Sequence, residues 1–188
     1  VTYKTAWRMC HEIRKYMAIV DGDDFIGGSG EIVEIDEAFF GGPATNGGTG
    51  NYRKKKTIVV AMKERGGNIV SEVIPNTKRK TLWDAIERNI QRGTILNTDE
   101  YTSYRSITLR GYRHKTVNHG QGRYVSDDGA TVNAIEGYWA QLKRSINGTH
   151  IHVSGKHLQK YLGEFEFRHN RRQFPHLMID ELMTGFVR

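Results

Sequence analysis

The sequence predicts an α/β protein built on a mixed sheet, and three observations favour this class. Three β-type runs follow one another over residues 31–37, 57–62 and 69–74, with a hairpin signal between the last two. A helical pattern then separates the third run from another strand at 94–98, which is the β–α–β order of a crossover connection. Helical patterns with apolar stripes occupy most of the chain beyond residue 133.

The first element is a helix. Ala6, Met9, Ile13, Tyr16 and Met17 recur at helical spacing and predict an amphipathic helix over residues 4–18. The Asp- and Gly-rich residues that follow favour a linker. We therefore expect an N-terminal helix and linker over residues 1–28, followed by one domain over residues 29–188, which suits a chain of 188 residues.

The next elements are three antiparallel strands. An apolar run ends at Asp36, and the glycine-rich residues 41–50 predict a loop after it. A basic run leads from this loop into the strand at 57–62. The hairpin signal at residues 65–68 then returns the chain as the strand at 69–74.

The second half of the chain alternates helices with short strands. A stripe of Leu82, Ile86 and Ile90 predicts a helix over residues 79–92, with Gly93 just after its end. The strand at 94–98 leads to Asp99, and a further strand is expected at 114–117. A polar loop at 120–129 separates these elements from three helices. The first helix begins near residue 133, the second spans about 156–171, and the third spans about 176–187.

The charge balance favours a polyanionic partner. The chain has 28 Lys and Arg residues against 21 Asp and Glu, a net charge of +7, and a pI near 9.5. A solvated basic face explains the charge equally well, but the clustering of the basic residues tips the interpretation toward nucleic acid. The single Cys10 excludes an internal disulfide and a multi-cysteine zinc site, and it fits a reducing cytosol. No apolar run approaches the roughly 18 residues of a membrane span, so no membrane partner is expected.

Three acidic residues sit where a metal-dependent nucleic-acid enzyme needs them. Asp36 and Asp99 each end a strand-like run, and Glu136 lies near the start of a helical pattern. Carboxylates on separate elements can converge on Mg²⁺ or Mn²⁺, and two such ions stabilise the attacking and leaving oxygens of a phosphoryl transfer. Taken singly, Asp36 and Asp99 are also ordinary residues for ending a strand and starting a turn.

Five motifs in order carry a resemblance to a known family. They are Glu34–Gly42, Asn97–Tyr104, Val117–His119, Thr131–Arg144 and His157–Arg172. With these motifs the chain resembles the catalytic domain of bacterial insertion-sequence transposases of the Merlin-related group, within the DDE, RNase H-like superfamily. The resemblance implies an RNase H-like mixed sheet, with three antiparallel strands followed by parallel strands and helices on its flanks.

The resemblance also implies the roles of the acids. Asp36 would lie on the central first strand and bridge two Mg²⁺ or Mn²⁺ ions, Asp99 would bind one of them, and Glu136 would be the third carboxylate. Glu136 lies 37 positions after Asp99, an interval that suits these enzymes. A different residue could be the third ligand, because some relatives carry a non-acidic residue there. The candidates for this place are Asn133, Glu37, Glu100, Asp127 and Asp128.

Candidate DNA-binding residues form several groups. Lys143 follows Glu136 by two helical turns, and in the family a basic residue at this offset contacts DNA near the cleaved phosphate. His119 would orient substrate or water, although a surface hydrogen bond explains it equally well. The other basic clusters are also compatible with solvated surface. The full set is Arg53, Lys54, Lys55, Lys56, His119, Lys143, Arg144, Arg168, Arg171 and Arg172.

The function implied by the resemblance is metal-dependent cleavage at transposon ends followed by strand transfer into target DNA. The implied partners are double-stranded DNA and further copies of the chain, and the implied location is the bacterial cytoplasm at the nucleoid. An RNase H-like nuclease without strand transfer and an inactive DNA-binding remnant are the competing interpretations. The chain begins at Val1, and relatives often carry a recognition region before the catalytic domain, so residues 1–28 are expected to be the tail of such a region.

Overall fold

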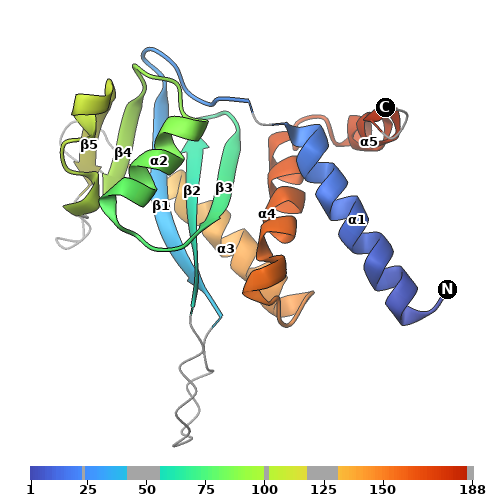
Figure 1. The fold of residues 1–188 in the computed structure, drawn as a ribbon. Helices are drawn as coiled ribbons and strands as arrows, with labels where there is room; N and C mark the ends of the chain where they lie inside the picture. The colour runs from blue at the N-terminus through green and yellow to red at the C-terminus, as the bar shows by residue number, and fades with distance from the viewer. Residues whose placement is uncertain (23, 42–55, 100–101, 118–130, 186–188) are drawn as a thin grey trace, which may run out of the picture.

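A five-stranded sheet lies at the centre of the computed structural model, which describes residues 1–22, 24–41, 56–99, 102–117 and 131–185 (Figure 1). The strand order is β3-β2-β1-β4-β5. Strands β1 to β3 are antiparallel neighbours, whereas β4 runs parallel to both β1 and β5. The predicted RNase H-like mixed sheet is therefore confirmed. The strands are β1 Ile32–Phe40, β2 Thr57–Glu64, β3 Ile69–Ile74, β4 Ile95–Asp99 and β5 Arg113–Val117.

Helices cover both faces of this sheet (Figure 1). Helix α2 packs on one face, while α3 and α4 pack on the other. Their apolar residues follow the helical repeat, as in α3, where Ile135, Trp139, Leu142 and Ile146 are all buried. The α-helices are α1 Tyr3–Asp21, α2 Arg79–Asn89, α3 Asn133–Gly148, α4 Gly155–Asn170 and α5 Met178–Gly185, and short 3₁₀ helices occupy Thr102–Tyr104, Ile107–Arg110 and Pro175–Leu177.

The two faces of β1 belong to different cores. Val33 and Ile35 pack with the α2 side, whereas Ala38 and Phe40 pack with α3 and α4. Successive residues of a strand point to opposite faces, so the even-numbered residues of β1 share the α3 side. This parity places Asp36 on the side of α3.

Several predicted boundaries are off by two or three residues, and two of them affect the core and the site. Helix α2 ends at Asn89 rather than at residue 92, because Ile90 adopts an extended backbone and forms a bridge with Ile26. The Tyr112 hydroxyl donates to the Ile90 carbonyl at 2.9 Å and holds this exit. Strand β1 continues to Phe40, since its last residues pair with β2, so Asp36 lies inside the strand rather than at its end.

Helix α1 packs along α4. Arg14 forms an ion pair with Glu164 at 2.7 Å, and the ring of His11 meets those of His157 and Tyr161 edge-on, with centroids 5.0 and 5.8 Å away. Gly163 permits the close approach, because a Cβ there would lie 2.6 Å from the Cβ of Ala18. The division of the chain at residue 28 stays a prediction.

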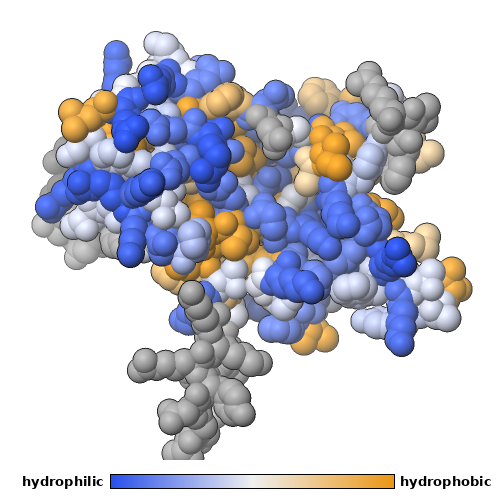
Figure 2. Space-filling view, viewed as in Figure 1, coloured by the Kyte–Doolittle hydropathy of each residue, from blue (hydrophilic) through white to orange (hydrophobic). Residues whose placement is uncertain are grey.

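Hydrophobic side chains are also exposed on the outer helices. Ile19 on α1 and Met183 on α5 are examples, and Figure 2 shows hydrophobic surface in the region of these two helices. The surface over α2 in the same view is mostly hydrophilic. None of the helices in the described residues combines the length and apolar character needed to span a membrane.

Candidate active site

The site lies where β1 and β4 stop pairing. The two strands are in register only over Ile32–Ile95, Val33–Leu96 and Glu34–Asn97. Continuing this register by two residues sets Asp36 beside Asp99, on the same face of the sheet. Asp99 is the last residue of β4, as predicted. The two aspartates therefore lie on neighbouring strands, just beyond the point where the strands stop pairing.

Helix α3 brings the third acid to this point. Glu136 lies in the first turn of α3, and its side chain is exposed. The indole of Trp139, one turn later on the same helix, donates a hydrogen bond from Nε1 to Oδ2 of Asp36 at 3.0 Å. Helix α3 is thus fastened directly to the first aspartate.

The pKa of Asp36 is influenced by the charges of both other acids. Burial raises the pKa of the Asp36 carboxyl above its usual value, and the negative charges of Asp99 and Glu136 raise it further. The Trp139 hydrogen bond opposes this rise because it stabilises the ionised form. A cation at this position would relieve the repulsion among the acids.

Glu37 occupies the opposite face of β1. Burial, with smaller contributions from the charges of Asp36 and Asp99, raises the pKa of Glu37 to about 7. The Tyr104 hydroxyl donates a hydrogen bond to Oε1 of Glu37, which opposes this rise. Strand parity turns this carboxyl away from α3, so Glu37 is a poor replacement for Glu136 as third ligand. Asn133 is exposed at the first position of α3. Glu100, Asp127 and Asp128, the remaining candidates for the third ligand, lie outside the described residues.

The donor set suits a hard divalent cation. Asp36, Asp99 and Glu136 all offer carboxylate oxygens, which are the ligands that Mg²⁺ and Mn²⁺ prefer. Within the described ranges, no group of three or more His, Cys, Asp or Glu side chains has the geometry of a metal site.

The start of α3 is held by a buried acid on β1. Glu34 is only 1% exposed, and its Oε2 accepts hydrogen bonds from the backbone amides of Ala134 at 2.9 Å and Ile135 at 3.2 Å. These are first-turn amides that lack partners within the helix. Val132, the residue that precedes α3, provides no side-chain cap, so Glu34 performs this role from a distant strand.

A second buried polar residue reaches the same segment from β4. Asn97 is 1% exposed, and its Nδ2 donates to the carbonyl of Thr131 at 3.2 Å. The Thr131 hydroxyl in turn donates to Oε1 of Glu34 at 3.0 Å. Arg65 contacts both groups, at 3.0 Å from the Thr131 hydroxyl and 3.4 Å from Glu34.

The predicted DNA-binding residues on α3 are exposed. Lys143 lines a cavity of about 410 Å³ together with Phe39, Asn147 and His152, and Arg144 follows it with its Nε donating to the Ala140 carbonyl. In the basic run after the glycine-rich stretch only Lys56 is described, and it is exposed. Arg53, Lys54, Lys55 and His119 lie outside the described residues.

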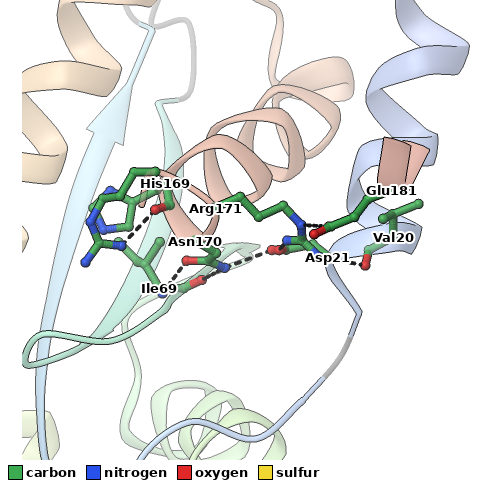
Figure 3. A network of polar contacts seen from close by, with 8 residues as sticks. Val20, Asp21, Ile69, His169, Asn170, Arg171 and Glu181 are labelled. Atoms are coloured by element: carbon green, nitrogen blue, oxygen red, sulfur yellow. Dashed lines mark hydrogen bonds and ion pairs between the residues drawn. The ribbon is translucent and has the colours of Figure 1, made fainter. Parts of the chain in front are cut away.

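The predicted basic cluster at the end of α4 makes contacts within the protein (Figure 3). Arg171 forms ion pairs with Asp21 and Glu181 and donates to the Val20 carbonyl at 3.1 Å, which joins α4 to α1 and α5. Its neighbours are also paired, Arg168 with Glu164 at 2.9 Å and Arg172 with the carbonyls of His169 and Gly67. These contacts give Arg171 a structural role, whereas Arg168 and Arg172 form exposed contacts, and the contact of all three arginines with DNA stays a prediction.

Sequence reasoning overlooks the residues that hold the acids in place. Glu34, Asn97 and Trp139 enter it only as parts of motifs. One signal is present in the sequence, because Glu34 precedes Asp36 by two residues and Asn97 precedes Asp99 by two residues. This spacing places each pair on one face of its strand.

Comparisons with known proteins identify relatives. A curated protein of Haemophilus influenzae, described as an uncharacterized transposase-like protein, is 26% identical over 108 residues, covering 56% of this chain and 83% of that protein. Among solved structures, the Mos1 transposase paired-end complex with left transposon end has a TM-score of 0.43 and 12% identity, covering 98% of this chain and 63% of that one. The Mos1 strand transfer complex has a TM-score of 0.41 and 13% identity, covering 95% of this chain and 62% of that one.

A family match covers most of the chain. The family described as the ISXO2-like transposase domain matches residues 28–170, a range that contains β1 to β5, α3 and all three acids. The resemblance to insertion-sequence transposases seen in the sequence motifs is thereby confirmed. The chain belongs to the ISXO2-like transposase domain family.

Proposed function

We propose that this chain carries the catalytic domain of a DNA transposase, which cuts DNA at the ends of a mobile element and joins them to target DNA. The observation that supports the proposal is that β1, β4 and α3 carry Asp36, Asp99 and Glu136 to one region of the sheet, where Trp139 of α3 donates a hydrogen bond to Asp36. Family membership supports the same function. In this proposal residues 29–188 form the catalytic domain, and residues 1–28 are the tail of a DNA-recognition region.

The proposed reaction has two displacements. Water attacks the phosphorus of the phosphodiester at the element end, and the bond to the 3′-oxygen breaks to leave a 3′-hydroxyl. That hydroxyl then attacks a phosphodiester of the target strand and displaces its 3′-oxygen. Neither step needs a protein nucleophile, since positioning and charge stabilisation suffice for in-line displacement.

The residues of the site have distinct tasks in this reaction. The carboxylates of Asp36, Asp99 and Glu136 hold the divalent cations, and Trp139 fixes the orientation of Asp36 through its indole N–H. When bound, Mg²⁺ or Mn²⁺ ions supply the charge that stabilises the attacking and leaving oxygens. Lys143, two turns along α3 from Glu136, holds the DNA backbone beside the site as a point charge.

The proposed partner is double-stranded DNA, bound by several copies of the chain that together hold two element ends. The net charge of +7 supports attraction to the phosphate backbone. Lys143 and Arg144 are exposed on α3 and place two positive charges on this helix, beyond Glu136.

The test incubates the protein with a labelled duplex that carries the ends of the mobile element encoding it, in Mg²⁺ or Mn²⁺. A duplex with scrambled ends is the substrate control. Asp84→Asn is a matched protein control, since it neutralises an acid on α2 across the sheet. Nicked ends together with products joined to a target plasmid support transposition. Cleavage without joining points to a nuclease, and DNA binding without cleavage points to an inactive remnant.

A further inference from the structure

On both strands, a buried polar residue precedes the aspartate of the site by two positions. Two residues before Asp36 on β1 is Glu34, and two residues before Asp99 on β4 is Asn97. Glu34 and Asn97 face each other in the parallel register, and each is 1% exposed. Each strand therefore presents a buried polar side chain on the same face as its aspartate, one step deeper in the sheet.

Both deeper residues hold the backbone that enters α3. Glu34 accepts from the amides of Ala134 and Ile135, and Asn97 donates to the Thr131 carbonyl. The Thr131 hydroxyl closes the group by donating to Glu34. An ionised carboxylate beside the first turn of a helix is also favoured by the helix dipole. The start of α3 is thus tied to the same two strands that carry the aspartates.

Glu136 lies immediately beyond this attachment. It follows Ile135, the second residue whose amide is bound by Glu34, and it belongs to the same turn of α3. When first-turn amides lose their acceptor, the helix end frays and the backbone beneath Glu136 loses its fixed position. Trp139 lies a turn farther along and stays bound to Asp36, so fraying would affect the third acid more than the first.

We propose that Glu34, supported by Asn97, is a positioning residue that sets Glu136 against Asp36 and Asp99. This inference rests on the proposed function, because it assigns Glu34 to the assembly of the cation site. A residue that merely stabilised the fold would alter the thermal midpoint and leave the affinity for cations unchanged. Partners that orient metal ligands, by contrast, typically change metal affinity or activity by about 10–100-fold when they are replaced.

The test compares wild-type protein with Glu34→Gln. Glutamine keeps the size of the side chain and one acceptor oxygen but loses the charge and the second acceptor. We expect faster hydrogen exchange at the amides of Ala134 and Ile135. We also expect the dissociation constant for Mn²⁺, followed by electron paramagnetic resonance of the free ion without DNA, to rise by about 10-fold or more.

Two further variants separate positioning from stability. Ile35→Val alters the adjacent β1 residue, which packs on the α2 side, and it should lower the thermal midpoint without changing Mn²⁺ affinity. Thr131→Val removes one donor to Glu34 and leaves the carboxylate in place. Thr131→Val should weaken Mn²⁺ binding by a smaller factor than Glu34→Gln does. It also tests the inference if Glu34→Gln does not fold.

The outcomes distinguish this inference from the proposed function. Equal Mn²⁺ affinity in the wild type, Glu34→Gln and Thr131→Val, together with faster exchange at the start of α3, would overturn the positioning role alone. Absence of Mn²⁺ binding by the wild-type protein would overturn the proposed function and this inference with it. Weaker Mn²⁺ binding in both variants, but not in Ile35→Val, supports the inference.

Discussion

Two substitutions of Asp36 separate its charge from its hydrogen bond. Asp36 accepts a hydrogen bond from the Trp139 indole at 3.0 Å, and Trp139 is 4% exposed. Asp36→Asn removes the charge and keeps an oxygen that can accept this bond, whereas Asp36→Ala removes both. Both variants should lose cleavage, because neither offers the negative charge that a divalent cation requires.

The difference in thermal stability between these two variants follows from the loss of the buried Trp139 hydrogen bond. A buried donor left without its partner costs about 1–3 kcal/mol of stability. For a chain of this size, each kcal/mol moves the thermal midpoint by about 2–4 °C. Asp36→Ala should therefore melt roughly 2–12 °C below Asp36→Asn. Asp36→Asn itself should melt no lower than the wild type without metal, because it removes a buried charge that lies near Asp99 and Glu136.

The assay combines calorimetry in a chelating buffer with cleavage of end DNA in Mn²⁺. Loss of several kcal/mol of charge stabilisation lowers the cleavage rate by about 10³-fold or more, and this should occur in both variants. DNA affinity measured in Ca²⁺ should stay close to that of the wild type. Normal cleavage by Asp36→Asn would refute the catalytic role of Asp36. Equal thermal midpoints of Asp36→Asn and Asp36→Ala would refute a contribution of the Trp139 hydrogen bond to stability.

Three other predictions concern DNA binding and stability. DNA affinity should fall with salt, with a slope of about 0.9 per phosphate neutralised and with little sequence preference, and a flat response in a filter-binding titration would contradict this. Lys143→Ala should slow cleavage and lower that salt slope by about one while Mn²⁺ affinity is unchanged, so weaker Mn²⁺ binding would argue against a role at the DNA backbone. Burial raises the pKa of Glu166 from 4.5 to about 8, so the folded state keeps a proton that the unfolded state loses, and stability should fall as the pH rises from about 4.5 to about 8. Glu166→Gln should remove this slope, whose limit is about 1.4 kcal/mol per pH unit, and an unchanged slope in thermal midpoints at pH 6 and pH 8 would show that another group titrates.

The sequence predicted the elements that depend on local periodicity. The strand at 69–74 and the stripe along α3 were predicted correctly, because alternation and the helical repeat are visible within a few residues. The end of α2 was misplaced because Ile90 continues the apolar stripe but pairs with Ile26, a contact between residues far apart in the chain. The position of Asp36 within β1 was misjudged for a similar reason. A polar residue after an apolar run does not reveal that pairing with β2 continues beyond it.

The acids of the site were easier to predict than the residues that support them. Asp36, Asp99 and Glu136 were recognised from motifs, whereas the cap that Glu34 provides joins residues 100 positions apart. Nothing near Ala134 in the sequence indicates where its acceptor comes from. Once the register of β1 and β4 is known, the matching positions of Glu34 and Asn97 follow directly from the pairing.

The hydrogen bond between Trp139 and Asp36 also allows cation binding at the site to be followed by tryptophan fluorescence. Excitation moves electron density in an indole from its pyrrole ring toward its benzene ring, and the Asp36 carboxylate lies at the pyrrole N–H. Its negative charge therefore stabilises the excited state and shifts emission to longer wavelength. The chain has three tryptophans, so replacing Trp7 and Trp83 by phenylalanine leaves Trp139 as the single tryptophan, which can be excited at wavelengths that tyrosine does not absorb. A cation that neutralises Asp36 would shift this emission to shorter wavelength, which gives an intrinsic fluorescence signal of site occupancy that requires neither DNA nor an attached label.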